Sequence, residues 1–265
     1  MAHPIYRQIA EDLRRQIESG ELRSGSQLPT EHDLQYRYEA SRNTIRDAIK
    51  LLTQLGLVRT RAGQGTFVIE KMDPFITTLS MDPTSGSGGA DSTSYLSQVS
   101  GNDRKQPSAG PVRVAIEPAS EKVASGLWRR PETEVISRQE QRYIDGIPWS
   151  LQTSYYPAEF ADRGAERLRS PQVMTEGTIQ YLGRTLGLRQ VGYRDWMTVR
   201  APSATEADFL TLPADGGVLV YDISRTAFDG NGQPIRLTVT VYPTDRNQFL
   251  FEVGEVPELR LPLDA

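Results

Sequence analysis

The sequence contains no cysteine and only two histidines among its 265 residues. Without cysteine the chain has no disulfides, no thiol nucleophile and no thiolate ligands for zinc. The histidines, His3 and His32, have no carboxylates at metal-ligand spacing, so we expect neither a metal nor a cofactor. No apolar run is long enough to span a membrane, and the N-terminus lacks the apolar core of a signal peptide. We therefore expect a cytoplasmic protein without a membrane partner.

An excess of positive charge is also lacking, since the net charge is −4. The charge is uneven: residues 1–71 hold 11 Lys+Arg and 9 Asp+Glu (+2), and residues 72–265 hold 19 and 25 (−6). The length suits one large or two ordinary domains. Because the first segment is only slightly basic, any nucleic-acid binding there must depend on where its arginines stand.

Residues 40–55 predict an amphipathic helix that enters the major groove of DNA. Ser41 is a good N-cap, and apolar residues recur behind it at helical spacing: Ile45, Ala48, Ile49, Leu52 and Leu55. The opposite face carries Arg42, Asn43, Arg46, Lys50 and Thr53, with the acidic Asp47 beside them. Arginine suits guanine and asparagine suits adenine. The alternative is an ordinary helix with a solvated face.

The neighbouring residues predict a winged helix-turn-helix. Pro4 opens a helix with a repeat of isoleucine and leucine up to Ile17, and Thr30 caps a short helix over 31–38 with Asp33 at capping-box spacing. After the helix stop at Gly56, residues 57–61 and 66–69 alternate as strands around Gly63-Gln64-Gly65. The first strand places Arg59 and Arg61 on one face. A plain hairpin turn is the alternative to a DNA-contacting wing.

The segments 27–34, 40–48, 55–57 and 63–68, in this order and spacing, resemble the winged helix-turn-helix of the GntR family of bacterial transcription regulators. The resemblance covers about residues 4–70. It implies DNA contacts by the start of the positioning helix, by the recognition helix and by the wing: Thr30, Glu31, Ser41, Arg42, Asn43, Thr44, Arg46, Arg61, Gly63, Gln64, Gly65 and Thr66. Asn43 stands where the family more often has threonine.

Composition then divides the rest of the chain. Residues 82–111 hold seven Ser, five Gly and three Pro, which is typical of a flexible linker. We assign residues 1–71 to a DNA-binding domain, 72–111 to a linker and 112–265 to a second domain. In that domain we expect strands at 112–116, 135–144, 149–156, 193–199, 218–228 and 234–242. Short helices are expected at 120–127, 180–186 and 205–210, and Asp145-Gly146 predicts a hairpin. This pattern indicates an α+β fold with an antiparallel sheet.

Spaced doublets in the second domain resemble the UTRA effector domain of the HutC subfamily, whose fold is similar to chorismate lyase. They are Arg142–Pro148 with Ser154–Pro157, and Asp229-Gly230, Gln233–Ile235 and Val241-Tyr242 with Asp245-Arg246 and Phe249. The resemblance spans about residues 111–255. It implies a small-molecule effector.

Arg138 and Arg142 lie four residues apart on one predicted strand and so share a sheet face. Two guanidinium groups there could bind a carboxylate or phosphate, although a solvated face is equally compatible. The resemblance adds Thr178, near a helix start, and Tyr242. Arg236 stands where many relatives have an acid, which disfavours a sugar-phosphate effector and supplies a possible third cation. We therefore expect an anionic effector near Arg138, Arg142 and Arg236.

We expect a homodimeric regulator, most often a repressor, that binds double-stranded DNA at a palindromic operator and responds to the effector. One alternative is a regulator whose second domain only dimerises. A second alternative is an enzyme of chorismate-lyase-like fold. The sequence shows no nucleophile beside a base, no metal cluster and no cofactor motif, so we expect no catalytic residues.

Overall fold

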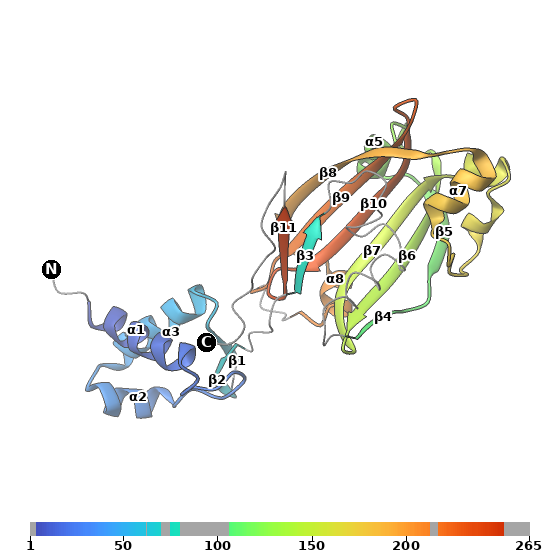
Figure 1. The fold of residues 1–265 in the computed structure, drawn as a ribbon. Coiled ribbons are helices and arrows are strands. Elements are labelled where there is room, and N and C mark those ends of the chain that lie inside the picture. The colour runs from blue at the N-terminus through green and yellow to red at the C-terminus, as the bar shows by residue number, and fades with distance from the viewer. Residues whose placement is uncertain (1–3, 62, 70–74, 80–105, 213–216, 252–265) are drawn as a thin grey trace. The chain divides into compact units, whose positions relative to one another are not determined.

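The computed structural model describes residues 4–61, 63–69, 75–79, 106–212 and 217–251. The chain divides into two compact units, Met1–Asp73 and Pro74–Ala265, each of which is described by itself (Figure 1). Most of the predicted linker, residues 80–105, lies outside the described ranges. Among the described residues, no helix has both the length and the apolar content needed to cross a membrane.

The first unit is three helices followed by a two-stranded antiparallel hairpin: α1 (Ile5–Glu18), α2 (Glu31–Tyr38), α3 (Arg42–Gln54), β1 (Val58–Arg61) and β2 (Gly65–Val68). Its core is the apolar side of the three helices, where Leu13, Leu34, Ile45 and Leu52 are fully buried. This order of elements is the one that the sequence predicts.

Both predicted helix caps are present. The Thr30 hydroxyl accepts from the Asp33 amide at 3.2 Å, and the Asp33 carboxylate accepts from the Thr30 amide at 3.1 Å. Ser41 Oγ accepts from the Thr44 amide at 3.2 Å. The expectation that Leu55 belongs to the buried stripe is wrong: α3 ends at Gln54, and Leu55 is 55% exposed at the C-cap. The caps fix where α2 and α3 start, and therefore which residues form the first turn of α3.

The second unit is built on a seven-stranded sheet in the order β4-β6-β7-β10-β9-β8, with β5 also pairing to β6. Its strands are β4 (Pro107–Ala109), β5 (Arg113–Pro118), β6 (Glu134–Ile144), β7 (Ile147–Pro157), β8 (Gln190–Arg200), β9 (Val220–Asp229) and β10 (Pro234–Pro243). The described pairings within this sheet are antiparallel, as expected. A separate pair, β3 (Phe75–Leu79) and β11 (Asn247–Phe251), is parallel, and its strands lie side by side in Figure 1.

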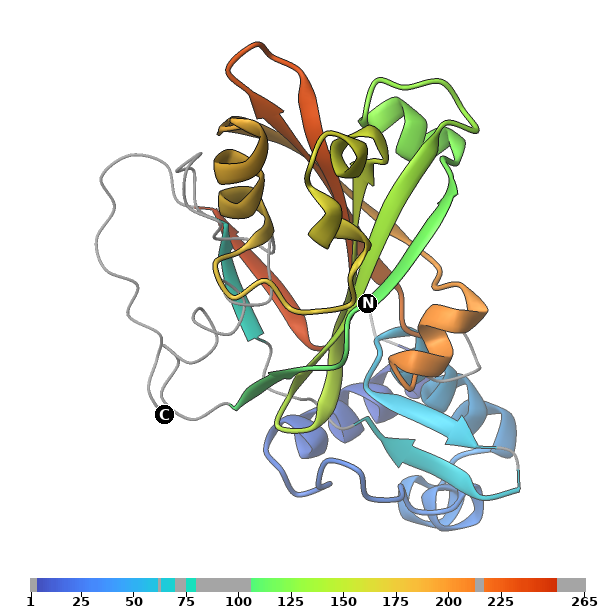
Figure 2. The ribbon, with the colours of Figure 1, turned by 90° about the vertical axis from the view of Figure 1, so that its right-hand side faces the viewer.

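Helices cover both faces of this sheet (Figure 2). One face holds an apolar cluster under α6 (Glu159–Asp162), the 3₁₀ helix η1 (Glu166–Arg169) and α7 (Thr178–Leu186). A second cluster, with Phe75 of β3, Phe249 of β11 and Tyr242, lies at the other end of that face. The opposite face packs against α5 (Glu121–Gly126) and α8 (Ala204–Phe209).

The larger elements agree with the sequence pattern, and several of the shortest ones were not predicted. Asp145 and Gly146 form the predicted hairpin with φ of 52° and 77°, the left-handed values that a two-residue turn requires. Two strands, β3 and β4, fall in the range 72–111 that the sequence assigns to a linker. The sequence pattern also misses β11 and α6. Each is five residues or shorter and gives little periodic signal. The four-residue strands β1 and β2 were predictable because the Gly63-Gln64-Gly65 turn lies between them.

Candidate nucleic-acid interface and ligand site

The exposed side of α3 carries the predicted recognition residues. Arg42, Asn43, Arg46 and Lys50 are all exposed, while Ile45 and Ala48 are buried beneath them. Thr44 is half-buried, and its hydroxyl lies 2.8 Å from that of Ser41. The N-terminal half of the helix therefore presents two guanidinium groups and one amide to solvent, which is the chemistry that reads guanine and adenine edges.

Glu31, at the first turn of α2, holds both arginines. Its carboxylate accepts from Arg42 Nε at 2.9 Å and from Arg46 Nε at 3.0 Å. Hydrogen bonds from Arg42 and Arg46 lower the pKa of Glu31 below its ordinary value. Both bonds use Nε, so they leave the terminal amino groups of each guanidinium to bind elsewhere. A carboxylate repels phosphate, and the position of Glu31 suits it to orienting these two arginines; its predicted contact with DNA stays a prediction.

The hairpin after α3 has the form of a wing. Arg61 is exposed and stacks on the Phe67 ring at 4.9 Å, and the hydroxyls of Thr60 and Thr66 lie 3.1 Å apart. Gln27 Nε2 donates to the Gln64 carbonyl at 2.9 Å and so fixes the tip. Gly65 has a φ of 117°, a backbone conformation that residues with a Cβ rarely adopt, and a Cβ there would also meet the Gln27 side chain. The φ value explains the second glycine of the motif.

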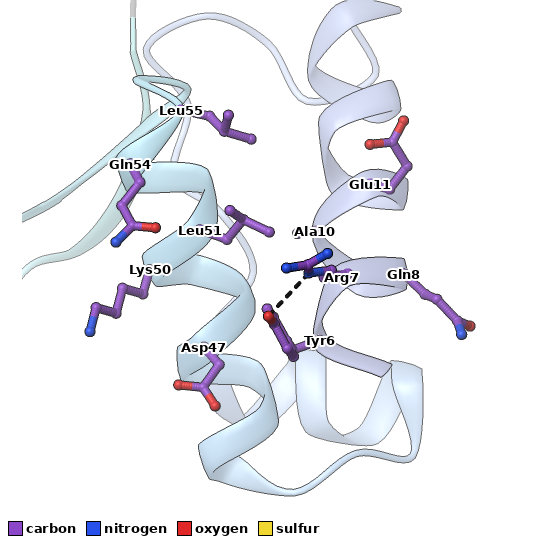
Figure 3. A pocket seen from close by; sticks show the side chains of 10 residues that line it. All are labelled: Tyr6, Arg7, Gln8, Ala10, Glu11, Asp47, Lys50, Leu51, Gln54 and Leu55. Carbon is purple, nitrogen blue, oxygen red and sulfur yellow. Dashed lines mark hydrogen bonds between the residues drawn. The ribbon is translucent and has the colours of Figure 1, made fainter. Parts of the chain in front are cut away.

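An open hollow of about 850 Å³ lies between α1 and α3 (Figure 3). Its lining mixes Arg7 and Lys50 with Glu11 and Asp47, and Arg7 Nε donates to the Tyr6 hydroxyl at 3.1 Å. The two carboxylates make this hollow a poor match for a phosphate backbone. We therefore do not assign this hollow to the DNA-contacting surface.

The ligand site expected in the second unit corresponds to a polar strip on the sheet face that α7 covers in part. Between the two apolar clusters of that face, the side chains are buried and polar: Arg138, Arg142, Ser150, Gln152, Ser154, Arg225, Thr238 and Thr240. Ser154 lies 3.1 Å from Thr238 through their hydroxyls, and Thr240 donates to Gln152 at 3.2 Å. Buried polar groups are costly unless they are hydrogen-bonded, so this strip is the part of the sheet suited to a polar ligand.

Arg138 is directed at the protein's own backbone. Its guanidinium donates to the carbonyls of Arg167, Leu168, Ser170 and Gln172. These carbonyls belong to η1 and the loop after it, so Arg138 pins that loop to the sheet. An incoming anion would have to compete with several carbonyl oxygens for Arg138. We therefore infer that Arg138 lines the site but is not the main cation that binds the anion.

Arg142 is the better placed cation. It is fully buried, with Glu140 Oε2 at 3.4 Å, and its strand neighbour is Ser150. The Ser150 hydroxyl is fully buried and has no hydrogen-bond partner among the described residues. Tyr242 is buried nearby: burial raises its pKa, and the positive charges of Arg142 and Arg225 oppose that shift. Arg142, Ser150 and Tyr242 thus form one polar group on the sheet.

Of the other two predicted ligand residues, Arg236 lies apart from this group. Arg236 is buried opposite Ala227, with Gln190 Oε1 at 3.4 Å. Arg236 and Tyr242 are six positions apart along β10, which is about 20 Å of strand, so Arg236 is not the third cation beside Arg142. Thr178 is the first residue of α7, near the helix start where the sequence analysis places it, and its side chain is buried; its role in ligand binding stays a prediction.

The sequence analysis missed Arg225 and Asp195. Arg225 Nε and Nη2 donate to the two Asp195 oxygens at 2.7 and 2.6 Å, and the guanidinium stacks on the Tyr193 ring at 3.9 Å. Alternating polar residues in strands that are otherwise apolar, such as Ser150-Gln152-Ser154 and Thr238-Thr240, were the available signal for this strip. Such alternation normally marks a solvated face, so it does not by itself indicate a buried site.

Comparison with known proteins identifies both units. Residues 5–68 match the family described as bacterial regulatory proteins, gntR family, and residues 103–248 match the UTRA domain. The second match alone spans more than half of the chain. Together the two matches cover the helix-turn-helix with its wing and the described sheet from β5 to β10.

Similar proteins extend over nearly the whole chain. An HTH-type transcriptional regulator of Rhizobium meliloti (strain 1021) is 27% identical over 95% of this chain and 96% of its own. The HTH-type transcriptional repressor NagR of Bacillus subtilis (strain 168) is 25% identical over 93% of each chain. The crystal structure of a protein assigned to the GntR family of transcriptional regulators has a TM-score of 0.71, with 24% identity over 96% of this chain and 99% of that one.

Proposed function

The chain belongs to the GntR family of bacterial regulatory proteins and carries a UTRA domain, and from this premise we propose that it is a homodimeric repressor with a palindromic operator and an anionic effector. It is a DNA-binding transcription regulator, like its relatives, among them the repressor NagR. What we add is the symmetry of the operator, the dimer, the charge of the effector and the residues that bind each ligand. Since it acts on DNA, we place it in the cytoplasm.

The observation that carries the DNA-binding proposal is the exposed Arg42–Arg46 surface at the capped start of α3. In a helix-turn-helix these positions meet base edges, and a dimer reads two half-sites about 34 Å apart. We expect Arg46→Ala to weaken operator binding by about 1–3 kcal/mol and to relax sequence preference at one base pair.

Binding is measured by fluorescence anisotropy on DNA from upstream of the gene. Arg15→Ala is the matched control, because Arg15 is 69% exposed on α1 and forms a local ion pair with Asp12. Equal losses for Arg46→Ala and Arg15→Ala would show that overall charge, and not the helix face, determines binding.

The effector proposal rests on Arg142, Ser150 and Tyr242. A buried guanidinium beside a buried hydroxyl with no partner among the described residues suits one carboxylate or phosphate group. Its test is a thermal-shift screen of organic acids and phosphate esters, because a ligand that binds only the folded state raises the melting temperature. Arg142→Ala should abolish the shift that the best compound gives, and Ser150→Ala should reduce it.

A second candidate is a regulator whose UTRA domain only dimerises. The bonding of Arg138 to backbone carbonyls favours it, because that cation is already used in the fold. Absence of any melting shift across the screen, together with normal operator binding, would support this second candidate over the first.

A further inference from the structure

A groove lies on the sheet face opposite to the polar strip, bounded by α5 and by the strands β8 and β9. Its volume of about 390 Å³ is within the range of small-molecule sites. Its lining combines aromatic side chains with cations, and no acidic residue is among the described residues that form it: Trp128, Trp196, Phe228, Lys122 and Arg194 carry the rings and charges. The hollow between α1 and α3 has two carboxylates, so this groove is the better match for an anion.

Trp128 has a backbone conformation that normally belongs to glycine. It follows the C-cap of α5 with a φ of 53°, and the Arg129 amide donates to the Ala124 carbonyl at 2.8 Å, as in a Schellman motif. This left-handed conformation is strained for a bulky residue. The indole is nonetheless 53% exposed, with its ring centroid 5.5 Å from that of Phe228. A strained backbone that presents an aromatic ring to solvent indicates a function for that ring.

The edge strand β8 adds a second indole and a guanidinium to the same groove. Arg194 and Trp196 are two positions apart and therefore point to one face of the sheet, and Trp196 is 67% exposed. Arg194 is exposed and stacks over the Phe228 ring at 5.4 Å, and it has no ion pair with another described residue. Lys122, in contrast, is bound to Asp222 at 2.7 Å. Arg194 is therefore the cation in this groove that is available to an anion.

We propose that this groove binds an aromatic carboxylic acid with a flat ring. The ring lies against Trp128 and Trp196, because indole faces stack on flat rings. The carboxylate binds Arg194, because a guanidinium can donate two parallel hydrogen bonds to it. The groove is separate from the proposed effector site, since Asp195 points to the other sheet face, where it binds Arg225 of the polar strip. The second unit thus has a second small-molecule ligand besides the effector.

Fluorine NMR tests where the ligand binds, because the chain has three tryptophans. The protein is labelled with 5-fluorotryptophan, its signals are assigned with Trp→Phe variants, and 2-naphthoate is titrated in as the probe. The signals of Trp128 and Trp196 should shift together and reach saturation. Trp149, which is 3% exposed and precedes Ser150 of the proposed effector site, should not shift. A shift of the Trp149 signal alone would place the probe at the effector site and overturn the groove, and so would the absence of any shift.

The role of Arg194 is tested by removing the charge from either partner. The amide 2-naphthamide has the same rings without the carboxylate, so it should bind about tenfold more weakly, which is the loss of one charge-assisted pair. Arg194→Gln should remove this preference. Arg184→Gln is the matched control, because Arg184 is 67% exposed on α7 and pairs with Glu176. Equal binding of the acid and the amide to the unmodified protein would indicate unspecific apolar contact and overturn the proposal.

Trp128→Gly separates ligand binding from folding. Glycine adopts the left-handed conformation without strain, so the variant should remain folded by circular dichroism and bind 2-naphthoate about tenfold more weakly, through the loss of one stacking partner. Glu132→Gly is the control, because Glu132 has a similar φ of 66° and lies outside the groove, and it should bind like the unmodified protein. A folded Trp128→Gly protein with unchanged affinity would show that the groove is not the binding site.

Discussion

At the scale of single residues, Glu31 links the two parts of the helix-turn-helix. It stands at the start of α2, and its carboxylate binds Arg42 and Arg46 of α3. Ordering two long side chains before DNA arrives lowers the entropy that binding must offset. The same negative charge repels phosphate wherever DNA binds without specific base contacts. Glu31 should therefore favour the correct sequence over random DNA.

We predict opposite effects of Glu31→Gln on two kinds of DNA. Affinity for random duplex should rise by less than about tenfold, since one negative charge is removed near the phosphates. Discrimination between the operator and random DNA should fall, by up to about 1–3 kcal/mol for one base pair read by these arginines. Competition binding at two salt concentrations measures both. A uniform change on both DNAs would mean that Glu31 acts only through charge.

The helix caps, which join residues close in the sequence, were predictable. The contacts between residues far apart in the sequence were not. The caps at Thr30 and Ser41 depend on neighbours three residues away, so the sequence contains all the information they need. The bond between Glu31 and Arg46 crosses fifteen residues and depends on how α2 and α3 pack. For the same reason Arg236 looked like a companion of Arg142 until the strand register placed it elsewhere.

At the scale of elements, one ion-pair network joins the helices of one sheet face to two strands. Arg200 of β8 binds Glu206 of α8 at 2.7 Å and Asp222 of β9 at 2.8 Å, and Lys122 of α5 binds Asp222 at 2.7 Å. Burial alone would raise the pKa of Asp222 and Glu206, but hydrogen bonds from the cations outweigh it, and both pKa values lie below the ordinary carboxyl value. The network therefore stabilises the fold when both carboxyls are ionised.

We predict that Arg200→Met lowers the free energy of unfolding by about 1–2 kcal/mol at neutral pH, a value reduced because Arg200 is partly exposed. Because the carboxyl pKa is lower in the folded state, the ion pairs stabilise the protein at pH values above the unfolded-state pKa, which is about 4. This stability is lost as the pH falls through the folded-state pKa. The difference between wild type and Arg200→Met should thus shrink below about pH 4. Denaturant titrations across pH measure it.

Arg169→Met is the control for that series, since the Arg169–Asp162 pair is 40% and 65% exposed and should contribute little. Equal effects of the two substitutions would contradict a special role for the Arg200 network.

Elements were predictable where their pairing is local. β6 and β7 are joined by Asp145-Gly146, and the two flanking runs carry clear strand patterns. β3 and β11 pair in parallel although 167 residues lie between Leu79 and Asn247 and neither run has a turn signal for the other. Their burial of Phe75 and Phe249 against Tyr242 is a tertiary effect that no local pattern could reveal.

At the scale of the whole molecule, the chain consists of two units with separate cores. Leu13, Leu34 and Ile45 centre the first core, and the sheet with its helices forms the second. A domain with its own buried core can fold alone. Binding a palindrome with high affinity requires two linked DNA-binding domains, because the second domain then binds its half-site at a high effective concentration. On the proposed function, the second unit provides that link.

We therefore predict that the fragment 1–73 folds and binds a single half-site as tightly as the full chain does. On the complete palindrome the full chain should bind at least about a hundredfold more tightly than the fragment, because only the full chain gains from linkage. Inserting about 5 base pairs between half-sites turns them to opposite faces of the duplex, so it should weaken the full chain and leave the fragment unchanged. Circular dichroism establishes folding and anisotropy the affinities. If the fragment matched the full chain on the palindrome, the second unit would contribute nothing to operator recognition, and the dimeric reading of the site would be wrong.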